Sequence, residues 1–170
     1  GADLSASTGT APQFAGARFG NANLAGAVWK GADLRGSDLR GANLTAAQLL
    51  GCLVLGTNLA GAKVEGLRLD GSLVDATTVW PAGIVPEALG ARVLGPGASL
   101  PDLALVADVQ LTKLDLQGLR AERLVALRAN FSEALLEAAV LTGADLSGAR
   151  FVGATMRSAN ASAFGNFDAI

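Results

Sequence analysis

The sequence lacks histidine and tyrosine altogether and contains one cysteine, Cys52, and one methionine. The absence of histidine excludes the usual Ser-His-Asp triads and histidine metal sites. A single cysteine excludes an intramolecular disulfide framework and fits a reducing compartment, so we expect a cytoplasmic protein. We interpret Cys52 as a small buried apolar residue, and we predict no catalytic residue, cofactor or metal site.

Charge is also scarce, because charged residues make up only 16% of the chain. Residues 1–80 carry six basic and six acidic side chains, and residues 81–170 carry seven basic and nine acidic ones. Neither half is strongly basic, so we expect no direct nucleic-acid binding. No apolar run approaches the ~18 residues of a membrane helix, so we expect no membrane insertion.

What the sequence does contain is a five-residue period. A large apolar residue, here called position i, occurs at every fifth position from Phe14 to Val79 without a shift of register. Position i−2 is small, position i−1 is mostly polar, and position i+2 is often glycine. This period fits neither an α-helix nor a simple strand.

The period predicts a chain that takes a short extended step and then turns a corner, again and again. Alternate residues of an extended chain point to opposite sides, so positions i−2 and i face inward and i−1 faces outward. Glycine at i+2 supplies the backbone conformations that corners require. Four corners close a square, and successive coils pair as parallel strands about 4.8 Å apart.

The run GADLRGSDLRGANL at residues 31–44 resembles the pentapeptide-repeat family, whose consensus is A(D/N)LXX. The resemblance covers most of the chain. It implies an all-β fold, a right-handed quadrilateral parallel β-helix, here with a proline-rich interruption that is not part of the repeat.

The pattern stops at Trp80-Pro81, and four prolines follow that interrupt strand pairing. They are Pro81, Pro86, Pro96 and Pro101. The stretch Pro86–Leu89, followed by Gly90, predicts one short helical turn. We expect this segment to cover an open coil end, whose backbone N–H and C=O groups would otherwise be unpaired.

The period resumes weakly after the prolines. Its first four large positions are predicted at Val109, Leu114, Leu119 and Leu124. This register places Gln117 and Glu122 inward, which is a poor fit. Two extra residues follow, and the pattern is firm again from Phe131 to Met156.

An amphipathic helix within residues 119–138 is the alternative interpretation of this stretch. Four apolar residues have helical spacing there: Leu124, Leu127, Phe131 and Leu135. The small residues two positions before Phe131 and Leu136 favour the coil.

We therefore predict four segments along the chain. They are a first pentapeptide-repeat block at 1–80, a proline-containing cap or linker at 81–106, a second repeat block at 107–163 and a C-terminal tail at 164–170. Whether the two blocks form one column or two stays open.

One surface feature stands out, because residues one coil apart stack on the outside of such a fold. Lys30, Leu50 and Asp70 form one predicted column, and Leu53 and Leu73 stack on the next face. The same reasoning stacks Arg35, Leu55 and Asp75. We therefore predict an exposed apolar cluster with a charged rim, a candidate interaction patch formed by Leu50, Leu53, Leu55 and Leu73. The alternative is that residues 82–106 fold back and cover it.

The two aspartates Asp33 and Asp38 superficially resemble a catalytic carboxylate pair. They occupy i−1 positions of adjacent faces, and their nearest charges are Arg35 and Arg40. We therefore interpret them as solvated surface groups.

These observations predict a non-enzymatic β-solenoid scaffold that presents a protein–protein interaction surface to a partner whose identity the sequence does not give. The alternative comes from the resemblance, since some family members mimic duplex DNA and bind DNA gyrase. That mechanism needs a strongly negative face, which the sequence lacks. Such proteins commonly dimerise end to end; a homodimer is therefore open here, with Phe164 and Phe167 as candidate contacts.

Overall fold

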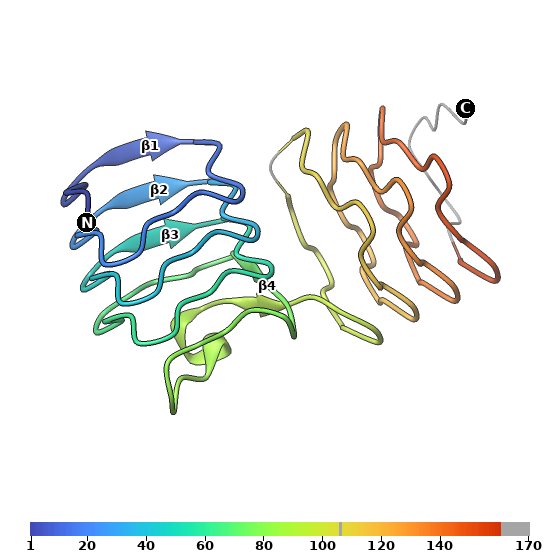
Figure 1. Ribbon diagram of the computed structural model, residues 1–170. Helices are drawn as coiled ribbons and strands as arrows, with labels where there is room; N and C mark the ends of the chain where they lie inside the picture. Colours follow the sequence, from blue (N-terminus) through green and yellow to red (C-terminus); the bar gives the residue numbers. More distant parts are fainter. Residues whose placement is uncertain (106, 161–170) are drawn as a thin grey trace. The chain divides into compact units, whose positions relative to one another are not determined.

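The structure is a computed structural model that describes residues 1–105 and 107–160. The chain divides into two compact units, Gly1–Val93 and Leu94–Ile170. Each unit is a stack of coils (Figure 1). The four segments predicted from the sequence were defined by the repeat pattern, whereas these two units are defined by their compactness. The boundaries of the four segments therefore stay predictions.

Regular secondary structure is sparse because most sides of a coil pair with the next coil through a single residue, which forms an isolated β-bridge rather than a strand. The elements are β1 (Thr8–Thr10), β2 (Val28–Lys30), β3 (Gln48–Leu50), β4 (Leu73–Val74), the 3₁₀-helix η1 (Pro86–Leu89) and β5 (Arg92–Val93). The order in the first sheet is β1-β2-β3, all parallel, and β4 pairs with β5 (Figure 1).

Parallel pairing between residues 20 apart builds the first unit. Thr10 pairs with Lys30, and Lys30 pairs with Leu50. Isolated bridges repeat this spacing on the other sides of the coil, as between Asp33 and Leu53. One coil is therefore 20 residues long and has four sides, which we call walls.

The four walls of the first unit are defined by their paired residues. The first wall contains β1, β2, β3 and residues 68–70; the second contains residues 33–35, 53–55 and 73–75; the third contains residues 18–20, 38–40 and 58–60; the fourth contains residues 3–5, 23–25, 43–45 and 63–65.

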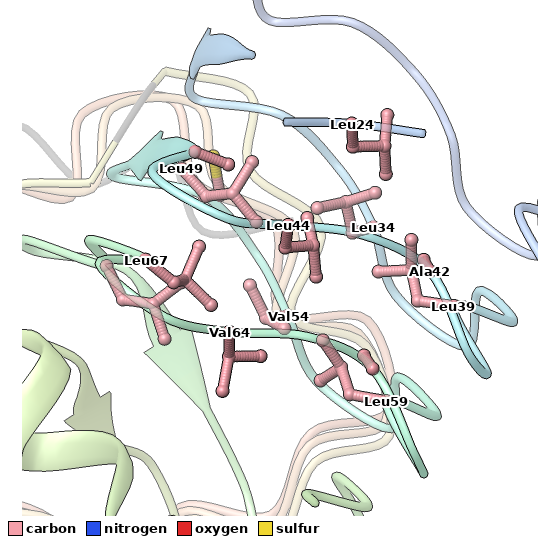
Figure 2. Close-up of a cluster of buried hydrophobic side chains, with 14 of the residues drawn as sticks. Leu24, Leu34, Leu39, Ala42, Leu44, Leu49, Val54, Leu59, Val64 and Leu67 are labelled. Atoms are coloured by element: carbon pink, nitrogen blue, oxygen red, sulfur yellow. The ribbon is translucent and has the colours of Figure 1, made fainter. Parts of the chain in front are cut away.

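The interior is filled by the inward residues that the period predicts. Leu44, Leu49, Val54 and Leu59 come from the four walls of one coil and point toward one another (Figure 2). Each is at most 1% exposed. Removing one such leucine side chain costs about 2–5 kcal/mol of unfolding free energy, so the interior specifies the fold.

Corners at position i+2 have the left-handed backbone conformation. Gly51 has a φ of 60°, and an added Cβ there would meet no atom within 4 Å. Ala46 occupies an equivalent corner with a φ of 56°. The corner therefore favours glycine for its backbone freedom rather than for space.

The aspartate or asparagine at position i−1 has a local structural role. Asn43 Oδ1 accepts a hydrogen bond from the backbone N–H of Thr45 at 3.2 Å, and Asp145 does the same for Ser147 at 3.1 Å. Such bonds to the residue two positions later stabilise the bend that leads into the corner. The repeat thus selects Asx residues for turn geometry as well as for solubility.

The first-unit register shifts by one residue before Val79, contrary to the sequence prediction. Asn58 pairs with Val79, which is 21 residues later. Val79 therefore lies at an outward position and is 47% exposed, while Thr78 takes the inward place at 8%. One extra residue in the corner after Val74 causes the shift, and nothing in the apolar pattern marks it.

Residues 80–93 complete the first unit. The predicted helical turn is confirmed as η1, and Gly90 ends it in the left-handed conformation. Leu69 N–H donates to the carbonyl of Leu89, and Arg92 N–H donates to that of Ser72. The proline-containing segment therefore pairs with the edge of the fourth coil, as expected of an end cap.

The second unit is also a stack of coils, and no residue of 119–138 is helical. Its register differs from the predicted one. Left-handed corners at Lys113, Gly118, Arg123 and Arg128 place position i at Leu111, Leu116, Ala121 and Ala126. The spacing then continues to Phe131 without extra residues.

The register was mistaken because large and small residues exchange places in this coil. Leu119 and Leu124 lie at i−2 and are buried, while Ala121 and Ala126 fill position i. These two sides still hold one large and one small residue each, so the interior volume is conserved there. Glu122 then falls at the outward i+1 position, which removes the apparent misfit of a buried carboxylate.

Candidate interaction surface

The interior of the first unit contains the single cysteine. Cys52 is buried, and its thiol lies 3.5 Å from the carbonyl oxygen of Trp29. Burial raises the pKa of this thiol to about 11, so the thiolate is scarce near neutral pH. Within residues 1–105 and 107–160, no three acidic or cysteine side chains gather as a metal site.

The outward aspartates of the second and third walls pair with arginines on the same wall. Asp33 binds Arg35, and Asp38 binds Arg40 at 2.6 Å. The side-chain hydrogen bond from Arg40 lowers the pKa of Asp38 to about 2. The two carboxylates bind their neighbouring arginines rather than each other. The interpretation as solvated surface groups nevertheless fits only Asp38 and is wrong for Asp33, which is 6% exposed.

The second unit has a set of ion pairs that the sequence analysis missed. Asp108 and Arg128 sit at stacked corners and form a pair at 2.7 Å, and Asp102 pairs with Arg123 in the same way. Hydrogen bonds from the arginines lower the pKa of both aspartates. Opposite charges about one coil apart were the available signal, but the mistaken register did not place them at stacked corners.

The first wall is open to solvent and carries the predicted column. Lys30 and Asp70 are exposed, and Leu50 between them is partly buried. Gly31 N–H donates to the carbonyl of Leu50 at 2.8 Å, and Gly51 N–H donates to that of Asp70 at 2.9 Å. An apolar side chain is thus held at equal spacing between a cation and an anion.

The second wall is different, because its outward leucines are buried. Leu53, Leu55 and Leu73 are 5%, 4% and 1% exposed. The prediction of an open patch is therefore wrong for these three residues. Repeat parity gives only the direction of a side chain from its coil, and it does not show what covers the wall. That these leucines form a contact surface stays a prediction.

Phe164 and Phe167, the candidate dimer contacts, lie outside the described residues. The helical structure in the described part of the chain includes nothing with the length and apolar character of a membrane-crossing helix.

Four-sided coils of 20 residues, small and large inward residues, and Asx turns define a β-solenoid repeat protein. Eight copies of the pentapeptide repeat match the sequence over residues 13–49, 37–73 and 128–162. These matches cover more than half of the chain, which therefore belongs to the pentapeptide-repeat family. Both units have the right-handed quadrilateral β-helix of that family.

Solved structures of other pentapeptide-repeat proteins are similar to this chain. One from Nostoc PCC 7120 is 28% identical over 54% of this chain and 79% of that one, with a TM-score of 0.42. One from Cyanothece 51142 is 31% identical over 46% of this chain and 53% of that one, with a TM-score of 0.31. QnrB1, a plasmid-mediated fluoroquinolone resistance protein, is 16% identical over 98% and 76%, with a TM-score of 0.35. No curated protein sequence matches significantly.

Proposed function

We propose that this protein is a non-enzymatic scaffold whose first wall binds a protein. Members of the pentapeptide-repeat family are generally structural or interaction proteins. The inward positions are occupied mostly by packed apolar side chains, and the single thiol is buried with a raised pKa. A rigid stack of coils holds outward side chains at fixed spacing, which suits recognition of a partner surface. A cytoplasmic location is part of this proposal.

The observation that carries the proposal is the position of Leu50 on the open first wall. Leu50 can bury its apolar surface against a partner, and the charges of Lys30 and Asp70 on either side can orient that partner. Around the corner at Gly51 lies the second wall, where the outward Leu53 is buried. We propose that Leu50 is the accessible member of the four-leucine patch. The other three members, Leu53, Leu55 and Leu73, are buried on the adjacent second wall.

The test compares Leu50→Asp with Ala60→Asp in affinity capture from the native host. Both residues occupy position i+1 of the same coil, Leu50 on the first wall and Ala60 on the third. We expect Leu50→Asp to lose a captured protein that the parent and Ala60→Asp retain, with equal melting temperatures for the two variants. Identical capture by all three proteins would refute the proposal.

A second pair of variants tests whether the leucines of the second wall are buried. Leu53→Asp combined with Leu55→Asp places two carboxylates where the parent side chains are at most 5% exposed. We expect this variant to lose stability, because burying an unpaired charge is costly. The matched control is Asn58→Asp with Ala60→Asp on the third wall, which we expect to fold like the parent.

The structure disfavours the gyrase-mimic alternative. A DNA mimic needs a continuous negative face to compete for a basic groove. Here arginines pair with many of the exposed carboxylates: Asp38, Asp70, Asp102, Asp108 and Glu122. A gyrase supercoiling assay with added protein tests this directly, and we expect neither inhibition nor protection.

A further inference from the structure

The charges on the first wall are arranged symmetrically about Leu50. Lys30 lies one coil before it and Asp70 one coil after it, and backbone hydrogen bonds of 2.8 and 2.9 Å link the three levels. Coils joined by parallel pairing are about 4.8 Å apart, so the cation and the anion are equally distant from the leucine. A two-fold axis through Leu50, perpendicular to the stack, exchanges the level of Lys30 with that of Asp70.

From this symmetry we infer that the first wall binds a second copy of this chain, with the two stacks antiparallel. In this pair, Leu50 packs on Leu50 of the second copy. Lys30 faces Asp70 of the second copy, and Asp70 faces Lys30 of the second copy. The inference rests on the proposed function and names the partner of the same site. A two-fold interface needs a patch complementary to itself, and this column satisfies that requirement.

The composition of the first wall supports a flat contact of this kind. Parallel pairing places β1, β2 and β3 side by side, so their outward side chains form one sheet face (Figure 1). Thr8 and Thr10 on β1 are small and uncharged, and Val28 on β2 is partly buried. Apart from Lys30 and Leu50, which make the proposed contact, the long outward side chain on these strands is that of Gln48, and it is partly buried.

Asp70 already contacts Arg68 on its own wall, at 3.0 Å. The side chains of Arg68 and Asp70 remain 59% and 54% exposed in this pair. An ion pair this open is weak, and its carboxylate retains an oxygen for a second cation. Lys30 of the second copy therefore adds to the pair instead of displacing a buried partner.

The second and third walls of the first unit do not satisfy the same requirement. The second wall repeats the order of cation, leucine and anion in Arg35, Leu55 and Asp75, but Leu55 is only 4% exposed. The third wall has Arg18, Asp38 and Asn58 at its outward positions, without an apolar centre. Of these three walls, only the first has an accessible leucine at the centre of a self-complementary order of cation, leucine and anion.

Charge reversal tests the inference with the full chain. Lys30→Asp leaves two acidic groups around Leu50, and Asp70→Lys leaves two basic ones. In a homodimer, either variant faces like charges twice, so we expect its association constant to fall about tenfold or more. Sedimentation equilibrium over a wide protein concentration range measures the association constant, and the melting temperature confirms folding.

The decisive measurement is an equimolar mixture of the two variants. Each acidic variant then faces a basic one, so both ion pairs form again and we expect association at or above the parent level. The double variant Lys30→Asp, Asp70→Lys should also associate like the parent. Leu50→Asp should abolish association in every combination, whereas Ala60→Asp should not change it.

Several outcomes would overturn the inference. They are a parent that stays monomeric at all concentrations, single variants that associate like the parent, and a mixture that does not recover association. If any of these occurs while Leu50→Asp still loses a captured protein, the proposed scaffold function stands and the first wall binds a different partner. If Leu50→Asp has no effect in either assay, both proposals fail.

Discussion

The hydroxyl group of Ser72 donates a hydrogen bond of 2.6 Å to the carbonyl oxygen of Leu49 on the preceding coil. The Oγ of Ser72 in turn accepts a hydrogen bond from the backbone N–H of Cys52 at 2.8 Å. Thr57 bonds the carbonyl of Leu34 in the equivalent way. A hydroxyl at position i−2 thus links three segments inside the coil, where water does not reach.

Ser72→Ala should therefore destabilise the first unit. The change leaves the N–H of Cys52 without its bond to the hydroxyl in a fully buried place, which costs about 2 kcal/mol of unfolding free energy. Ser37 provides the matched control, because its buried Oγ has no partner. Ser37→Ala should be neutral or stabilising within about 0.5 kcal/mol. Urea unfolding of both variants measures the difference, and equal losses would contradict this account.

Asp75 should be important for the shifted register before Val79. Its Oδ1 accepts hydrogen bonds from the N–H of Gly56 at 3.0 Å, and from the N–H and hydroxyl of Thr77 at 3.2 and 2.9 Å. Asp75→Ala removes these bonds together with a fourth, from the hydroxyl of Thr78 at 3.0 Å, and should cost about 2 kcal/mol, while Asp75→Asn keeps an acceptor and should cost clearly less. Thermal unfolding would show this order, and the reverse order would exclude the proposed role.

The register of the second unit has its own test. Ala126 fills an inward position and is fully buried, so Ala126→Leu should overpack the coil and cost about 1–3 kcal/mol. Glu122 lies outward and pairs with the exposed Arg120, so Glu122→Ala should cost no more than about 1 kcal/mol. Chemical denaturation compares the two. A larger loss for Glu122→Ala would favour the register that puts this carboxylate inside.

The Asp38 carboxyl should titrate at about pH 2, well below its ordinary value of 3.8, because Arg40 donates hydrogen bonds to it. A folded-state pKa below the unfolded one stabilises the fold above pH 3.8, and this contribution is lost as the pH falls through about 2. Arg40→Gln should move the titration midpoint upward. Carboxyl chemical shifts followed by NMR measure it, and an unchanged midpoint would disprove the assignment.

The Cys52 thiol should resist modification in the folded protein. Burial raises its pKa to about 11, so an aromatic disulfide reagent should react slowly at neutral pH and rapidly after unfolding in guanidinium. Absorbance of the released thiolate follows the reaction. Rapid modification of the native chain would contradict the interior position of this side chain.

The sequence by itself determined the coil and the direction of most side chains. Large apolar residues recur every five residues, and among them are Leu24, Leu34 and Leu44, ten residues apart. Packing in a narrow square requires that they point inward. The sequence also predicted η1 from Pro86 and Gly90, and the column of Lys30, Leu50 and Asp70. These features depend on local backbone geometry and on a constant coil length, which a periodic sequence carries directly.

The tertiary structure alone decided the register where that length changes and the accessibility of each wall. An extra residue before Val79 leaves the apolar spacing intact, because Thr78 fills an inward place through a hydrogen bond to the carbonyl of Val54. Leu124 and Ala126 exchange roles because packing conserves volume per side rather than residue order. Leu53 and Leu55 are buried although their positions face outward. A repeat therefore determines its own interior, whereas contacts beyond the repeat decide which outward residues remain available for binding.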